Sequence, residues 1–166
     1  MKNFFYGSHV IDSKDKSAVL KSLNNVLSQG PILKRFEKKA AKFFRAKYCV
    51  ATSSATSALH LTVKALNLKE RSEAFTSDMT FVATTNSCLY NNLKVNLIDI
   101  DNKNFNFDLD KLEKKLLKYN YKNKKLIIPV HFGGLPCDMK KINEFAKKYN
   151  SYVIEDASQA MGSKYY

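Results

Sequence analysis

The stretch KLIIPVHFGGLPCDMKKINEFAKKYNSYVIED, residues 125–156, predicts a strand, a helix and a second strand in that order. The segments 125–130 and 152–155 are short and apolar, as is typical of buried strands. The segment between them offers a helix cap at Asp138, and its apolar residues then follow a helical period. Those apolar residues are Met139, Ile142, Phe145, Ala146 and Tyr149. A unit of this kind predicts two parallel strands of one sheet.

The same order recurs on the N-terminal side of this stretch. Three further strands are expected, each followed by a helix, at residues 48–52, 73–76 and 95–98. Hydroxyl residues 53–57 cap the first helix, the second covers about 81–90, and the third is centred on Leu112. Strands that alternate with such helices indicate an α/β fold, with a mostly parallel sheet and helices on both faces.

Residues 1–30 are expected to form an N-terminal helical lead-in, and residues 31–166 to form one domain. A helix is expected to begin after Asp12-Ser13 and to carry apolar residues as far as Leu27. Gly30-Pro31 would then end that helix and begin another. The sequence has no internal repeat and no linker that would divide the rest of the chain.

The composition is that of a packed globular protein, since 45% of the 166 residues are hydrophobic and glycine and proline are scarce. The first residues lack the apolar run of a secretory signal, and no apolar run approaches the roughly 20 residues of a membrane span. Cys49, Cys88 and Cys137 lie far apart, which predicts reduced thiols rather than a metal site or a disulfide framework. We therefore expect a soluble, cytoplasmic protein without a metal.

The net charge of +13 raises the alternative of a basic nucleic-acid-binding domain. However, all 28 basic residues except Arg35, Arg45 and Arg71 are lysines. Recognition of bases and phosphates favours the arginine fork, and the lysines spread over several segments. A general lysine bias on solvated faces is therefore the favoured interpretation, and no nucleic-acid partner is expected.

Polar and aromatic residues follow four of the predicted strands, where open α/β sheets bind ligands. Ser54-Ala55-Thr56 begins a helix whose free amides suit a phosphate, although such residues also cap ordinary helices. Phe81 could stack on an aromatic ligand or fill the core. His131 could contact a ligand, but a hydrogen-bonded structural role is favoured. Asp156, with Gln159 close behind it, could pair with a protonated heterocycle or cap the next turn.

Together, the order, spacing and type of these residues resemble those of the DegT/DnrJ/EryC1/StrS aminotransferases. The resemblance covers nearly the whole chain and rests on Gly30-Pro31, Ser54-Ala55-Thr56, Thr80-Phe81-Val82-Ala83-Thr84, Pro129-Val130-His131 with Pro136 and Asp138-Met139, and Glu155-Asp156-Ala157-Ser158-Gln159-Ala160-Met161-Gly162. It implies a truncated large domain of a fold-type-I enzyme that depends on pyridoxal 5′-phosphate (PLP) and works as a homodimer. It also implies transfer of an amino group, commonly from glutamate, to a keto sugar attached to a nucleotide.

The resemblance assigns a cofactor-binding role to six residues, namely Ser54, Ala55, Thr56, Phe81, Asp156 and Gln159. The first three would hold the PLP phosphate, and the phenylalanine would stack on the pyridine ring. The aspartate would pair with the ring nitrogen, and the glutamine would lie near the ring hydroxyl. A protonated ring nitrogen makes the ring an electron sink, which is the chemistry that this cofactor brings.

The sequence departs from the family pattern at three places. Ala55 stands where many members have glycine, and residues 69–75 lack the usual Gly-Asp before their strand. The family's Schiff-base lysine lies in a later segment, beyond Tyr166, and Lys164 is expected to be a surface residue. Residues 1–166, which also lack the C-terminal small domain, are therefore expected to be inactive alone. The alternative is a noncatalytic fragment or split-gene module that needs a second chain to supply the lysine.

Within the family, the sequence is most similar to the transaminases of pseudaminic-acid biosynthesis. Those enzymes aminate C4 of a UDP-linked 4-keto-6-deoxy N-acetylhexosamine. The similarity rests on Tyr6-Gly7-Ser8, Ile11-Asp12, Val130-His131-Phe132 and Pro136-Cys137-Asp138-Met139. Other enzymes that make 4-amino sugars share most of these segments, so the exact sugar nucleotide and the choice between C3 and C4 stay open at this point.

Overall fold

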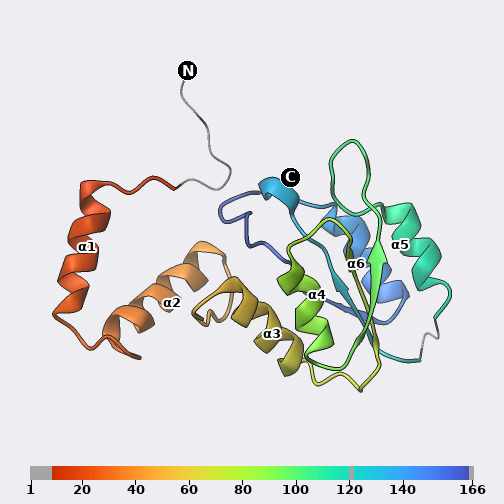
Figure 1. Ribbon diagram of the computed structural model, residues 1–166, viewed down its shortest axis with the longest axis horizontal. Coiled ribbons are helices and arrows are strands. Elements are labelled where there is room, and N and C mark those ends of the chain that lie inside the picture. The colour runs from red at the N-terminus through yellow and green to blue at the C-terminus, as the bar shows by residue number, and fades with distance from the viewer. Residues whose placement is uncertain (1–8, 120–121, 165–166) are drawn as a thin grey trace. The chain divides into compact units, whose positions relative to one another are not determined.

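The computed structural model describes residues 9–119 and 122–164. The chain forms two compact units, residues 1–51 and 52–166, and the second unit contains the whole β-sheet (Figure 1). This division falls later in the chain than the boundary expected at residue 30. The Tyr6-Gly7-Ser8 segment, on which part of the subfamily similarity rests, lies outside the described residues.

The first unit contains two helices whose starts follow the sequence signals. Helix α1 (Ser13–Leu23) is capped by Asp12, whose Oδ1 accepts hydrogen bonds from the N–H groups of Lys14 and Asp15. Helix α2 (Pro31–Phe43) begins directly after Gly30, with a proline at a position where a backbone N–H has no helical acceptor. Both helices lie within the described residues, and neither has a buried side chain. The two helices therefore do not form a core between them.

The second unit is built on four parallel strands in the order β2-β1-β3-β4. The strands are β1 (Glu73–Ser77), β2 (Lys94–Ile98), β3 (Lys125–Ile128) and β4 (Ser151–Val153). Ala74 of the central strand β1 pairs with Val95 on one side and with Leu126 on the other. The order and direction of the strands confirm the expected parallel sheet.

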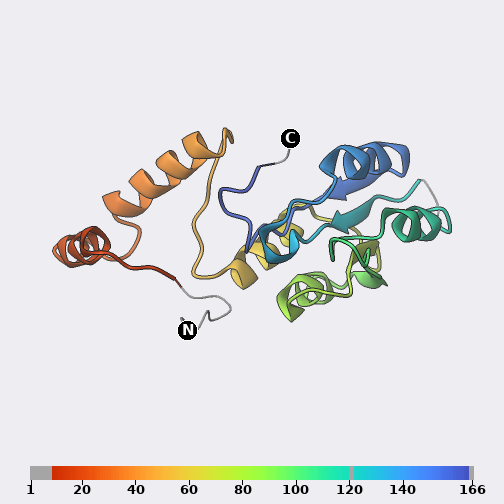
Figure 2. The ribbon, with the colours of Figure 1, turned by 90° about the horizontal axis from the view of Figure 1, so that it is seen from above.

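Helices cover both faces of this sheet, and α4 and α6 lie on opposite sides of it in Figure 2. The helices of this unit are α3 (Ala55–Ala65), α4 (Val82–Leu89), α5 (Leu109–Leu116), the short 3₁₀ helix η1 (Phe132–Gly134) and α6 (Met139–Lys148). Successive side chains of β3 alternate between the faces, because a strand has a period of two residues. Leu126 and Ile128 pack with α3 and α4, whereas Ile127 packs with α5 and α6. None of the helices in the described ranges is long and apolar enough to cross a membrane.

Residues 48–52 form no strand, so the prediction made for them was wrong. Tyr48 and Val50 are exposed, and the N–H of Ala51 donates to Oε1 of Glu37 at 2.9 Å instead of to another strand. β-propensity describes how side chains fit a half-buried pleated surface, and it cannot supply the neighbouring strand that such a surface requires. Among the described residues, no strand of the sheet pairs with this run.

The three cysteines are free thiols, as the sequence predicted. Cys49 is half-buried, whereas Cys88 and Cys137 are buried on opposite faces of the sheet. Burial raises the pKa of the Cys88 thiol to about 11 and that of the Cys137 thiol to about 11. The thiolate is the nucleophilic form, so these two side chains are structural rather than reactive at neutral pH.

Candidate functional site

Three of the four candidate junctions meet at the carboxyl edge of the sheet. Phe81 follows β1, His131 follows β3 and Asp156 follows β4. Val130 and Asp156 form an isolated parallel bridge, in which the N–H of Asp156 donates to the carbonyl of Pro129 at 2.9 Å. The N–H of His131 donates back to the carbonyl of Asp156 at 3.1 Å. The bridge continues the pairing of β3 and β4 beyond the named strands and fixes the backbone of Asp156.

Asp156 is only 6% exposed, and both oxygens of its carboxylate accept hydrogen bonds. Oδ2 accepts from the hydroxyl of Thr84 at 2.6 Å. Oδ1 accepts from the N–H of Ser158 at 3.2 Å and from its hydroxyl at 2.6 Å. A carboxylate offers about four lone-pair positions, so three donors leave about one for the N–H of a ligand. Asp156 therefore holds its own turn, as the capping alternative proposed, and still has an acceptor position for a cationic ring.

Phe81 is the residue that precedes α4, and it is 74% exposed. The alternative that this ring fills the core is therefore wrong, and a face of the ring is accessible to a ligand. The N–H of Thr84 donates to the carbonyl of Phe81 at 3.1 Å, which closes the first turn of α4. Because the hydroxyl of the same Thr84 donates to Asp156, the first turn of α4, which begins after Phe81, lies against the carboxylate.

Ser54 caps α3 by accepting a hydrogen bond from the N–H of Ser57 at 3.1 Å. Ala55 and Thr56 lie exposed in the first turn, whose N–H groups have no acceptor within the helix and suit an anion. The core residues of α3 anchor it on the sheet, and its last turn connects to the start of β1. Helix α3 therefore runs antiparallel to β1, with its first turn toward the carboxyl edge.

His131 is a structural residue, as the sequence predicted. Its ring is buried, and Nδ1 accepts a hydrogen bond from the N–H of Cys137 at 3.0 Å. Nε2 must then carry the proton of the neutral ring, and it donates to Oε2 of Glu155 at 2.9 Å. Gln159 is exposed, and its Oε1 accepts from the N–H of Gly133 at 3.1 Å. The glycine turn after β3 therefore orients the Gln159 side chain at the same edge.

Thr84 and Ser158 contact the candidate carboxylate, although sequence reasoning gave neither of them a role. Both lie inside segments that carry the family resemblance. Ser158 stands two residues after Asp156, which is the spacing of a turn in which an aspartate accepts from the backbone two residues on. That spacing could have identified Ser158. The contact of Thr84 joins residues 72 apart in the sequence and has no comparable local signal.

Replacement of Gly134 by alanine is expected to destabilise the protein much more than replacement of Gly133. Both have a positive φ, +86° and +58° respectively, so either substitution strains the backbone. A Cβ on Gly134 would also lie 2.9 Å from the carbonyl oxygen of Gln159, whereas a Cβ on Gly133 would meet no atom within 4 Å. Urea unfolding should therefore show a loss of about 1 kcal/mol for Gly133→Ala and a clearly larger loss for Gly134→Ala. Equal losses would contradict this close packing against Gln159.

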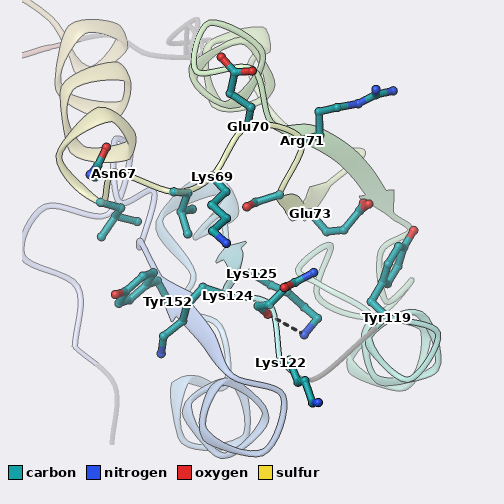
Figure 3. Close-up of a pocket in the computed structure, with 14 residues that line it drawn as sticks. Asn67, Lys69, Glu70, Arg71, Glu73, Tyr119, Lys122, Lys124, Lys125 and Tyr152 are labelled. Carbon is teal, nitrogen blue, oxygen red and sulfur yellow. Dashed lines mark hydrogen bonds between the residues drawn. The ribbon is translucent and has the colours of Figure 1, made fainter.

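A cavity of about 640 Å³ lies at the opposite, amino edge of the sheet and does not belong to this site (Figure 3). It is lined by residues at the starts of β1 and β3, among others, and by none of the six candidate residues. Lys125 is buried there, and its Nζ donates to the carbonyls of Asn123 at 3.2 Å and Tyr149 at 3.0 Å. Burial lowers the pKa of this ammonium group. Lys125 thus joins the starts of two strands and lies far from the carboxyl edge.

Comparison with known proteins identifies relatives across nearly the whole chain. The model of the DegT/DnrJ/EryC1/StrS aminotransferase family matches residues 9–166. A UDP-4-amino-4,6-dideoxy-N-acetyl-beta-L-altrosamine transaminase from Campylobacter jejuni is 40% identical over 161 residues, which are 96% of this chain and 42% of that enzyme.

Solved structures of two enzymes have the same fold. The Helicobacter pylori aminotransferase PseC, involved in the biosynthesis of pseudaminic acid, is 32% identical and superposes with a TM-score of 0.88 over 99% of this chain and 44% of its own. The Escherichia coli GDP-4-keto-6-deoxy-D-mannose-3-dehydratase, with bound hydrated PLP, is 26% identical, with a TM-score of 0.87 over 99% of this chain and 43% of its own.

These similarities confirm the fold class that the sequence predicted, the large domain of a fold-type-I PLP-dependent enzyme. The chain covers less than half the length of each of the three relatives. The match of the family model extends from His9 to the last residue and includes all four junctions. The chain therefore belongs to the DegT/DnrJ/EryC1/StrS aminotransferase family.

Proposed function

We propose that this chain forms the cofactor-binding part of a PLP-dependent aminotransferase that moves an amino group from glutamate to a nucleotide-linked 4-keto-6-deoxy sugar. The observation that carries the proposal is the buried Asp156 carboxylate, which has donors on both oxygens and an acceptor position left. The names of the Campylobacter and Helicobacter relatives support an amino-sugar product of the pseudaminic-acid type. The family resemblance also supports a cytoplasmic homodimer.

PLP, when bound, supplies an electron sink for amino-group transfer. Asp156 would hold a proton on the ring nitrogen, because an anion within hydrogen-bond distance favours the charged form of its partner. Burial strengthens this interaction, since the surroundings screen it less than water does. The burial of Asp156 and the donors on its oxygens support this proposed role.

The remaining candidate residues would hold the other parts of the cofactor. The first-turn amides of α3 and the hydroxyls of Ser54 and Thr56 would bind the phosphate at the positive end of the helix dipole. The exposed ring of Phe81 would stack on the pyridine ring. Gln159, oriented by its bond from Gly133, would lie near the ring hydroxyl. Phosphate, ring face and ring nitrogen would then be held by three different segments.

We further propose that residues 1–166 alone bind PLP weakly at most, without a covalent bond, and have no turnover. In the family the Schiff-base lysine comes from a segment that follows the stretch matching Met161 to Tyr166. Lys164 is exposed, which suits the surface role expected for it. In the whole protein, a segment outside residues 1–166 would supply the lysine.

Product analysis on the full-length protein tests the proposed reaction. Incubation with PLP, nitrogen-labelled glutamate and a UDP-linked 4-keto-6-deoxy N-acetylhexosamine should give a sugar labelled at C4 and one 2-oxoglutarate per amine. The same keto sugar linked to GDP, and a reaction without glutamate, are the controls and should give little or no amine. Amination at C3 would overturn the regiochemistry, and loss of a hydroxyl without amination would overturn the reaction type.

A further inference from the structure

We infer that the hydroxyls of Thr84 and Ser158 are positioning groups that fix the plane of the Asp156 carboxylate for its contact with a pyridine ring nitrogen. The inference rests on the proposed function, because it concerns the same PLP site. Its observation is separate, however: the two carboxylate oxygens are held from two different segments of the chain. Thr84 belongs to α4, and Ser158 belongs to the loop after β4.

The hydrogen bonds among these groups have a defined direction. An ionised carboxylate only accepts, so the single proton of the Thr84 hydroxyl must be given to Oδ2 of Asp156 at 2.6 Å. The hydroxyls of Thr80 and Thr84 lie 2.7 Å apart, and Thr80 must be the donor in that pair because the Thr84 proton is already used. Each hydroxyl therefore donates toward the carboxylate, and the chain of donors ends on Asp156.

The position of Thr84 makes its hydrogen bond costly to replace by water. Its side chain has no exposed surface, and Asp156 is nearly as buried. A buried carboxylate oxygen without a donor is strongly unfavourable, and water cannot easily reach this one. The hydroxyl of Thr84 therefore supplies a donor to a carboxylate oxygen that water could not easily reach.

Holding both oxygens also restricts rotation of the carboxylate. The terminal torsion of an aspartate side chain is broad, so a single donor would leave the plane of the group free to turn. Donors on both Oδ1 and Oδ2 restrict that rotation, so the remaining lone pair keeps one orientation. A ring nitrogen held by stacking on Phe81 needs an acceptor that stays in one place, because a small displacement weakens a directional hydrogen bond.

The test compares two ligands on the full-length protein: PLP and its deaza analogue, in which a C–H group replaces the ring nitrogen. The affinity of each is measured by titration followed by cofactor absorbance, and the preference for PLP over the analogue isolates the contact with the nitrogen. Thr84→Val keeps the shape of the side chain and removes the donor. It should lower the preference for PLP about tenfold, the loss expected when the hydrogen bond between Asp156 and the charged ring nitrogen is weakened, and leave the affinity for the analogue unchanged.

Three further variants complete the design. Thr84→Ser retains the hydroxyl and should restore the preference. Thr85→Val makes the same change one position along α4, at a half-buried site, and should leave the preference at the wild-type value. Ser158→Ala removes the hydroxyl on the other oxygen from an exposed side chain and should lower the preference even if Thr84→Val does not fold.

The outcomes separate this inference from the proposed function. If Thr84→Val and Ser158→Ala lower the affinities for PLP and for the analogue equally, or leave the preference for PLP unchanged, the hydroxyls have a structural role only. The inference is then overturned. If the wild-type protein binds PLP and its analogue equally well, Asp156 does not act on a ring nitrogen. That result overturns the assignment of Asp156 under the proposed function, and the present inference with it.

Discussion

Asp156→Asn is expected to lower the affinity of the full-length protein for PLP by about 100-fold, because a buried cation would lose its anionic partner. The fold should survive the change. An asparagine can accept from Ser158 with its carbonyl oxygen and donate to the Thr84 hydroxyl with its amide, which reverses the direction of the Thr80–Thr84 bond. The variant therefore removes the charge and keeps a hydrogen-bond partner for both Thr84 and Ser158.

Equilibrium titration with PLP measures this loss, and thermal unfolding without PLP checks the fold. Asp110→Asn makes the same chemical change in the first turn of α5, at an exposed carboxylate, and should leave the affinity unchanged. With residues 1–166 alone, borohydride reduction in the presence of PLP should attach the cofactor to no single lysine. Stoichiometric attachment to Lys164, together with turnover, would place the catalytic lysine within this segment.

Leu126→Ala is expected to lower the free energy of unfolding by about 2–5 kcal/mol. Leu126 has 0% of its surface exposed and lies on the strand next to the central strand, where it packs against α3 and α4. The change removes buried methyl groups and leaves a cavity that a parallel sheet covered on both faces cannot easily close. Domains of this size are stable by only about 5–15 kcal/mol, so a large part of the population could unfold near body temperature.

Leu97→Ala is the matched control, because it makes the same substitution on the edge strand β2 where the side chain is 49% exposed. Leu97→Ala should lower the free energy of unfolding by less than about 1 kcal/mol, since the side chain that it removes is only partly buried. Urea unfolding followed by circular dichroism measures both variants. Similar losses for the two would contradict the position of Leu126 in the core.

Most of the fold could be predicted because its signals are local. Asp12, Ser54 and Asp138 stand next to the helices that they cap, and each accepts a backbone hydrogen bond two or three residues further along. Residues 48–52 show the limit of such reasoning. Their β-propensity is a local property, whereas a strand also needs a partner whose position depends on the rest of the fold.

The candidate site divides in the same way. The place of Asp156 after a strand, and of Phe81 before a helix, followed from the order of elements and from the family resemblance. The exposure of the Phe81 ring did not, because sequence alone left stacking and core packing as alternatives. The donor to Oδ2 of Asp156 could not be predicted either, since Thr84 reaches it only when strands distant in the sequence become neighbours.

The position of β1 between β2 and β3 has a consequence for the order in which the chain folds. The pairing of β1 with β3 spans 52 residues, as the hydrogen bond from Thr76 to the carbonyl of Ile128 shows. Closing such a long loop costs conformational entropy before the stabilising contact between the two strands has formed. Folds with distant pairings therefore form slowly. On the ribosome, β1 and β2 are complete many residues before β3 emerges. Until then β1 keeps one edge open, and an N-terminal portion of this chain would be prone to aggregate during synthesis.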